Sequence, residues 1–256
     1  MTMHSWRAGY ADSPLGQIHY LVSAPRGGGE PIVLLNPRSR SCRALLPHLA
    51  PLHPTAVVDI PGFGLSAPPP EGATMEEVGA AVGAALASLG VSAAHLWGLH
   101  TGGKVAAALA LARPALALSL VVAGKSHSLV ADRMARNAAM KAQLDSNAPD
   151  AQLLKLEGKY VDDREGPAGG ARIYAANFAF DFAAALARIE ARTLVLEITS
   201  DDEDGKYGRH GAALALRAGN AVARTAPQVE ATGIDLYIGT GAMARIILDF
   251  AAGKGG

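Results

Sequence analysis

One short stretch of the chain has the residue spacing of a catalytic turn. Residues 96–103 read Leu-Trp-Gly-Leu-His-Thr-Gly-Gly, so Gly98 and Gly102 flank His100 two residues away on either side. This is the small-x-nucleophile-x-small spacing of a nucleophile elbow, where a strained strand-to-helix turn lifts one side chain to the top of a parallel sheet. The usual occupant is serine. A histidine at this position could act as a general base or as a nucleophile.

The elbow predicts the electrostatic setting of His100. The side chain would lie at the N-terminus of the next helix, where the helix dipole and burial both disfavour an imidazolium. The backbone N–H of Thr101 and a second donor from the loop at Arg38 would form an oxyanion hole beside it. Two alternatives stay open: Thr101 could be the nucleophile, or His100 could merely fill a vacated position.

Further polar residues follow apolar runs and would meet at the carboxyl edge of a sheet, where ligands of open α/β sheets bind. His127 could supply a second base, and Lys125 could hold an anion. Asn36 and Arg38 follow the first wholly apolar run, and a guanidinium binds carboxylates in a bidentate manner. Together these residues predict a small, carboxylate-bearing substrate, although each could also be a solvated loop residue.

An acidic run at 201–204 follows another apolar stretch. Asp201 could orient His100 as the acid of a catalytic triad orients its base, and its neighbours are expected in a solvated turn. Asp59 and Ser66 are expected to be structural. No spacing of His, Cys or acidic residues indicates a metal site, and no phosphate-binding glycine motif indicates a nucleotide. The sequence therefore predicts neither a metal nor a cofactor.

The elements that would position these residues alternate between strand and helix. A hairpin is expected over 6–13 and 17–23, and Thr74 and Glu77 form a capping box at the start of one helix. Strands are predicted at 32–35, 55–60, 94–97, 118–123, 193–198 and, weakly, 228–232; helices are predicted at 42–49, 75–89, 104–113, 209–218 and 241–252. This alternation is typical of a mostly parallel α/β sheet flanked by helices. The core would comprise 1–127 and 191–256, with 128–190 inserted as a helical cap.

Composition narrows the function classes. The 256 residues are 50% hydrophobic and carry 23 basic and 23 acidic side chains, so no net field favours nucleic acid or an anionic membrane. The single cysteine, Cys42, cannot form an internal disulfide, which fits a reducing compartment. No apolar signal-peptide core is present near the N-terminus, and Arg113 and Pro114 interrupt the longest apolar stretch. We expect a cytoplasmic protein with a small-molecule substrate; a homodimer is compatible with the sequence.

These motifs together resemble the α/β-hydrolase fold superfamily over nearly the whole chain. Residues 58–66, Val-Asp-Ile-Pro-Gly-Phe-Gly-Leu-Ser, are similar to the family's Asp-x-Pro-Gly-x-Gly-x-Ser segment, and 95–103 align with its Leu-x-Gly-x-Ser-x-Gly-Gly. The resemblance also has departures. His100 replaces the triad serine, in a His-Thr-Gly variant that resembles a minority of members, and Ile234 falls where the triad histidine is expected.

The resemblance implies hydrolysis of an ester, lactone, amide or C–C bond. Loss of the serine extends this to base-catalysed lyase or isomerase chemistry centred on His100. The alternative is a catalytically degenerate hydrolase that binds a small molecule or a partner without turnover. A scaffold protein has little support, because the chain has no charge blocks or repeats.

Overall fold

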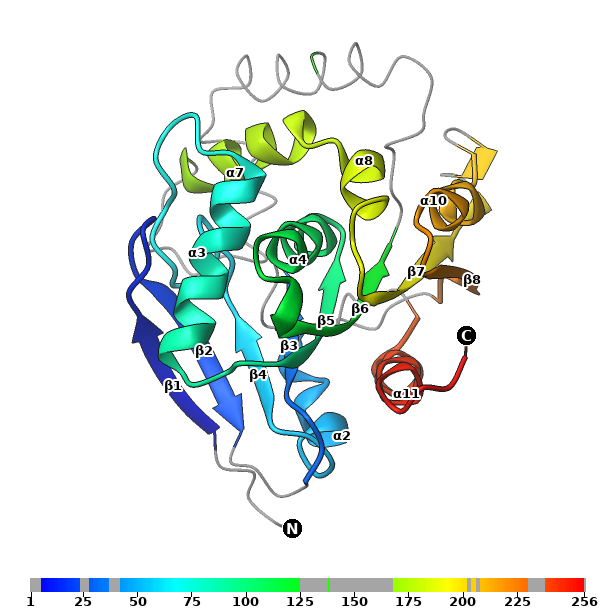
Figure 1. Ribbon diagram of the computed structural model, residues 1–256, viewed down its shortest axis with the longest axis horizontal. Coiled ribbons are helices and arrows are strands. Elements are labelled where there is room, and N and C mark those ends of the chain that lie inside the picture. Colours follow the sequence, from blue (N-terminus) through cyan, green and yellow to red (C-terminus); the bar gives the residue numbers. More distant parts are fainter. Residues whose placement is uncertain are drawn as a thin grey trace.

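A computed structural model of the chain describes residues 6–23, 28–36, 42–124, 138, 168–201, 204–205, 208–229 and 238–255. Within them, eight strands form one sheet in the order β1-β2-β4-β3-β5-β6-β7-β8 (Figure 1). The strands are β1 (Trp6–Ala11), β2 (Ile18–Ser23), β3 (Ile32–Leu35), β4 (Thr55–Val58), β5 (Ala94–Leu99), β6 (Ala117–Ala123), β7 (Arg192–Thr199) and β8 (Ala221–Pro227). β1 and β2 form an antiparallel hairpin, β2 pairs antiparallel with β4, and every later pairing is parallel. The predicted fold class is confirmed.

Helices cover both faces of this sheet (Figure 1). They are α2 (Leu46–Leu49), α3 (Met75–Ser88), α4 (Thr101–Ala112), α7 (Ala168–Ala179), α8 (Phe182–Leu186), α10 (Gly211–Arg217) and α11 (Thr240–Ala251), with a short 3-10 turn at Pro114–Leu116. Successive strand residues point to opposite faces. Val33 and Leu35 of β3 therefore join the core under α3 and α4, whereas Ile32 and Leu34 join the core under α2 and α11.

Two predicted elements differ from the structure. The weak strand expected at 228–232 is wrong at 228–229, its described part, which lies outside any strand; the strand in this part of the chain is β8, at Ala221–Pro227. β8 lies at the sheet edge with much of its length exposed, so it lacks the apolar run that marks a buried strand. The helix expected over 42–49 is interrupted: residues 42–43 are helical and α2 follows after a turn. Pro47 explains the break, since its ring clashes with the carbonyl group four residues earlier.

Several local predictions are confirmed. Thr74 and Glu77 form a reciprocal capping box at the start of α3, and the Thr74 hydrogen bonds lower the pKa of the Glu77 carboxyl group. The apolar stretch over 105–123 divides into the end of α4, the 3-10 turn and β6. In the described part of the chain, no helix is long and apolar enough to cross a membrane.

The described part of the region between β6 and β7 is mainly helical. Residues 125–137 and 139–167 lie outside the described residues, and α7 and α8 follow them. The Lys104 ammonium group in α4 donates a hydrogen bond to the backbone carbonyl of Asn177 in α7 at 2.6 Å. This bond ties α7 to the helix that follows the elbow. The boundaries and the cap function of 128–190 stay predictions.

Asp59 organises the loop that follows β4. Its carboxylate accepts hydrogen bonds from the His19 ring at 2.9 Å and from the Leu65 backbone at 3.0 Å, and both ring and carboxylate are buried. The Ser66 hydroxyl donates to the Asp59 carbonyl at 2.5 Å and accepts from the His19 backbone at 2.9 Å. A Cβ on Gly64 would lie 2.2 Å from the Asp59 carboxylate, which explains the glycine. These contacts give Asp59 and Ser66 the expected structural role.

Replacing Asp59 with alanine removes the acceptor that the His19 ring and the Leu65 N–H share. We expect Asp59→Ala to lower the free energy of unfolding by about 3 kcal/mol, because two buried donors lose their partner. Urea denaturation measures the change. The exposed residue Asp12 gives a matched control, and Asp12→Ala should cost less than about 0.5 kcal/mol. Equal costs for the two variants would contradict the structural role.

A pair of histidines packs at the amino edge of the sheet. The rings of His53 and His95 meet edge to face with centroids 6.0 Å apart, and His95 Nδ1 lies 2.9 Å from the Ser119 hydroxyl. Burial, followed by the charges of His53 and Arg192, lowers the pKa of His95; the Glu30 carboxylate opposes this shift. The fold therefore favours the neutral His95 ring.

This lowered pKa predicts a loss of stability in acid. Below the ordinary histidine pKa of about 6.5, the unfolded chain takes up a proton at His95 before the folded chain does, so stability falls as the pH falls. Thermal unfolding between pH 8 and pH 5 measures this slope. His95→Asn should make the slope shallower, whereas His48→Asn, which removes an exposed histidine of α2, should leave it as in the wild type. An unchanged slope in His95→Asn would show that another group causes any acid loss.

Candidate functional site

The turn between β5 and α4 has the geometry of a nucleophile elbow. β5 ends at Leu99, α4 begins at Thr101, and His100 alone connects them with φ 51° and ψ −116°. Among the described residues, His100 is the one non-glycine residue with positive φ. A residue with a strained backbone conformation persists only where the surrounding structure holds it.

Two glycines allow the close packing that holds the turn. A Cβ on Gly98 would lie 2.2 Å from the Gly102 carbonyl oxygen, and one on Gly102 would lie 2.0 Å from the Leu35 carbonyl oxygen. Real Cβ atoms do not approach backbone this closely, so both positions require glycine. The first turn of α4 therefore packs directly against the ends of β3 and β5, and the spacing seen in the sequence is a steric requirement.

His100 lies exposed at the tip of this buried assembly. Its backbone N–H donates to the Ala123 carbonyl at the end of β6, at 3.0 Å. Thr101 is buried, with only 5% of its surface exposed, and its N–H is in the first turn of α4, where amide groups have no intrahelical acceptor. The turn thus combines an exposed imidazole with an adjacent backbone donor and the positive end of a helix dipole.

The loop after β7 carries the acidic residues. Asp201 is exposed. Arg209 pairs with Asp204 at 2.7 Å. The hydrogen bond and charge of Asp204, together with the charges of Glu197 and Asp201, raise the pKa of the Arg209 guanidinium. The pairing of Asp201 with His100 stays a prediction.

The remaining predicted residues divide into one that is described and three that are not. Asn36, at the end of β3, is buried; burial also raises the pKa of the Cys42 thiol, which is therefore protonated near neutral pH. Arg38, Lys125 and His127 lie outside the described residues. Considering only the described residues, no three His, Cys, Asp or Glu side chains gather as metal ligands.

Comparison with known families identifies this arrangement. Residues 27–202 match the family model described as alpha/beta hydrolase fold, which is more than half of the chain. The chain belongs to the alpha/beta hydrolase fold family. No curated protein matches it in sequence.

Solved structures of alpha/beta hydrolase fold proteins superpose on nearly the whole chain. An enol-lactonase from Burkholderia xenovorans LB400 is 21% identical with a TM-score of 0.69, covering 95% of this chain and 100% of its own. A thermophilic esterase from Thermogutta terrifontis is 17% identical with a TM-score of 0.69, at 96% and 98% coverage. A haloalkane dehalogenase variant from Bradyrhizobium elkanii is 14% identical with a TM-score of 0.66, at 97% of both chains. At these identities the likeness establishes the fold.

Two residues of this alpha/beta hydrolase fold, one beside His100 and one in β7, were not predicted from the sequence. Gly124 follows β6 and lies under the His100 ring. Glu197 lies inside the apolar run of β7 yet is buried, and its carboxylate accepts from the His210 backbone N–H at 2.6 Å, just before α10. In the sequence, the signal for Gly124 is a glycine directly after a buried strand. The signal for Glu197 is a single acidic residue within an apolar run.

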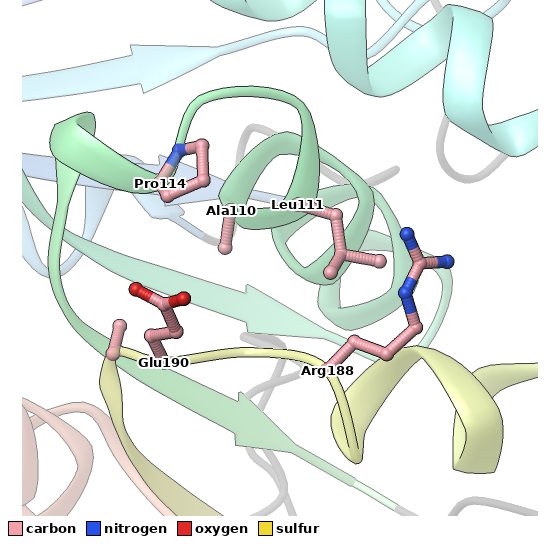
Figure 2. Close-up of a pocket in the computed structure, with 6 residues that line it drawn as sticks. Ala110, Leu111, Pro114, Arg188 and Glu190 are labelled. Atoms are coloured by element: carbon pink, nitrogen blue, oxygen red, sulfur yellow. The ribbon is translucent and has the colours of Figure 1, made fainter.

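A small cavity of about 190 Å³ lies at the opposite end of α4 from the elbow (Figure 2). It is lined by Ala110, Leu111, Pro114, Arg188, Glu190 and Ala191. In Figure 2 the Arg188 and Glu190 side chains border it from the segment before β7. Because α4 begins at the elbow and ends at this cavity, the cavity is remote from His100.

The close packing at Gly102 can be tested against a matched glycine. Gly102 and Gly241 are each the second residue of a helix that begins with threonine, but a Cβ on Gly241 would have nothing within 4 Å. We expect Gly102→Ala to lower the free energy of unfolding by about 3 kcal/mol or to prevent folding, because the methyl group would overlap the Leu35 carbonyl. Gly241→Ala should be neutral or stabilise by about 0.5 kcal/mol. Similar urea midpoints for the two variants would refute the steric account of the elbow.

Proposed function

We propose that this chain is a cofactor-independent enzyme, a hydrolase of small, carboxylate-bearing molecules in which His100 takes the place of the nucleophilic serine. The observation that carries the proposal is the exposed imidazole at the strained tip of an otherwise intact elbow. Strained conformations of this kind cluster at functional sites, because strain without a use is readily lost. The membership of the chain in a hydrolase-fold family supports the same reading.

His100 would act as general base on a water molecule or attack the substrate carbonyl itself. The N-terminal end of α4 disfavours an imidazolium, so the neutral ring that both roles require is the favoured form. The Thr101 N–H would donate to the oxyanion that develops on the carbonyl oxygen, with a second donor from the loop at Arg38. Asp201 would orient His100, as the acid of a triad orients its base.

The substrate side of the proposal depends on cationic and polar residues around the elbow. Arg38 and Lys125 would bind the carboxylate, Asn36 would lie at the margin of the site, and His127 could protonate a leaving group. Asn36 is buried at the end of β3, the strand that pairs with β5 beneath the elbow.

The bond that is cleaved follows from the same chemistry. An enol-lactonase and an esterase among the similar structures favour an ester or lactone, and C–C hydrolysis uses the same oxyanion site. Without a serine, the site could also support base-catalysed elimination or isomerisation. The second candidate is a degenerate hydrolase that binds a ligand without turnover. It is favoured by the sequence itself, which has His100 where the family has its triad serine and Ile234 where the family has its triad histidine.

Replacement of His100 tests the proposal. On a panel of carboxylate-bearing esters, lactones and β-keto acids, we expect His100→Ala to lower kcat/KM by about 10²- to 10⁴-fold, because the base or nucleophile is lost. His48 is an exposed histidine of α2, which packs on the opposite face of the sheet from α4. His48→Ala should therefore retain wild-type activity. Unchanged turnover in His100→Ala would remove His100 from the mechanism.

Two further results separate the candidates. A serine-directed phosphonate should not label the protein; labelling at Ser126 or at the buried Ser66 would overturn the role given to the elbow. No turnover across the panel, combined with saturable binding of one of these acids, would favour the degenerate hydrolase.

A further inference from the structure

The imidazole of His100 rests on the backbone of Gly124, the residue directly after β6. A Cβ at Gly124 would lie 2.7 Å from His100 Nδ1, 2.8 Å from Cε1 and 3.2 Å from Cγ. Contacts below about 3 Å do not occur for real Cβ atoms, so any side chain at position 124 would displace the ring. The ring nitrogen Nε2 lies farther from Gly124 than these three atoms.

The backbone beneath the ring is fixed on both sides. The Ala123 carbonyl accepts from the His100 N–H at 3.0 Å, and the Gly124 N–H donates to the Leu196 carbonyl of β7, also at 3.0 Å. Gly124 also has φ +97°, a backbone conformation that disfavours other residues. The end of β6 is therefore held between the elbow and β7, and it cannot easily retreat from a bulkier contact.

The contact between a side chain at position 100 and position 124 is closer for a histidine than for a serine. Of the atoms nearest to a Cβ at Gly124, a serine in the same rotamer would carry only the one corresponding to Cγ, at 3.2 Å. A shift of a few tenths of an ångström relieves that distance. Nδ1 and Cε1, the two closest atoms, exist only because residue 100 is a histidine, so the open space above position 124 matches the imidazole.

We propose that Gly124 is a positioning residue for His100: its missing side chain lets the imidazole lie with its Nδ1–Cε1 edge toward the end of β6. The catalytic part of this inference rests on the proposed function of His100. The packing part does not, because it can be measured as stability.

The packing part is tested by a double-mutant cycle. Gly90→Ala is the control for backbone cost, since Gly90 also has positive φ, +75°, but nothing lies within 4 Å of a Cβ there. We expect Gly124→Ala to lower Tm by about 4 °C more than Gly90→Ala does, because only the former meets a ring. In a His100→Ala background this excess should disappear.

Persistence of the excess in the His100→Ala background would overturn the inference. If Gly124→Ala alone does not fold, recovery of folded protein in the double variant supports it. Failure of both variants to fold, with Gly90→Ala folded, contradicts it.

The catalytic part is tested on whichever acid or ester the wild type turns over. Gly124→Ala should lower kcat by at least about tenfold with little change in KM, and should shift the pH at which kcat/KM is half-maximal, because the displaced imidazole is in a different environment. Gly90→Ala should change neither quantity. If the double-mutant cycle shows coupling in stability but these kinetic changes are absent, Gly124 is only a packing partner of His100 and its positioning role is refuted. A wild-type rate in His100→Ala would instead refute the proposed function.

Discussion

The site depends on one steric constraint, the close approach of the first turn of α4 to the ends of β3 and β5. This approach leaves no room for a side chain at Gly98 or Gly102, and it forces the single residue between β5 and α4 into a positive φ. Because the strands beneath are fully buried and hydrogen-bonded in parallel register, the turn cannot relax sideways. His100 is therefore held in place by the core of the protein, without a side-chain hydrogen bond of its own to cap the helix.

The same constraint explains why other motifs of the chain are structural. The loop after β4 is separated from the elbow by β3, and it must turn sharply to leave the sheet. Asp59 controls this turn through His19 and Leu65, and the interaction is buried. A carboxylate and an imidazole at hydrogen-bond distance would elsewhere suggest catalysis. Here the Asp59 carboxylate is committed to a loop, which gives it a structural role.

The sequence predicts those parts of the molecule whose cause is local. Wholly apolar runs such as 32–35 mark strands buried on both faces, and the glycines around His100 mark the elbow, because each pattern results from contacts within a few residues. β8 was misplaced because an exposed edge strand needs no apolar run. The relation between His100 and Gly124 was missed since it joins the ends of different strands, and only the sheet register brings them together.

Loss of the triad serine and of its histidine leaves a chemically coherent site. A serine requires a separate base to remove its proton, whereas a neutral imidazole is itself a base and a nucleophile. In the proposed mechanism, His100 in place of the serine would remove the need for a second histidine, and Ile234 at the family's histidine position is consistent with this proposal. A ring needs more room than a hydroxyl group, and the glycine at the end of β6 supplies it.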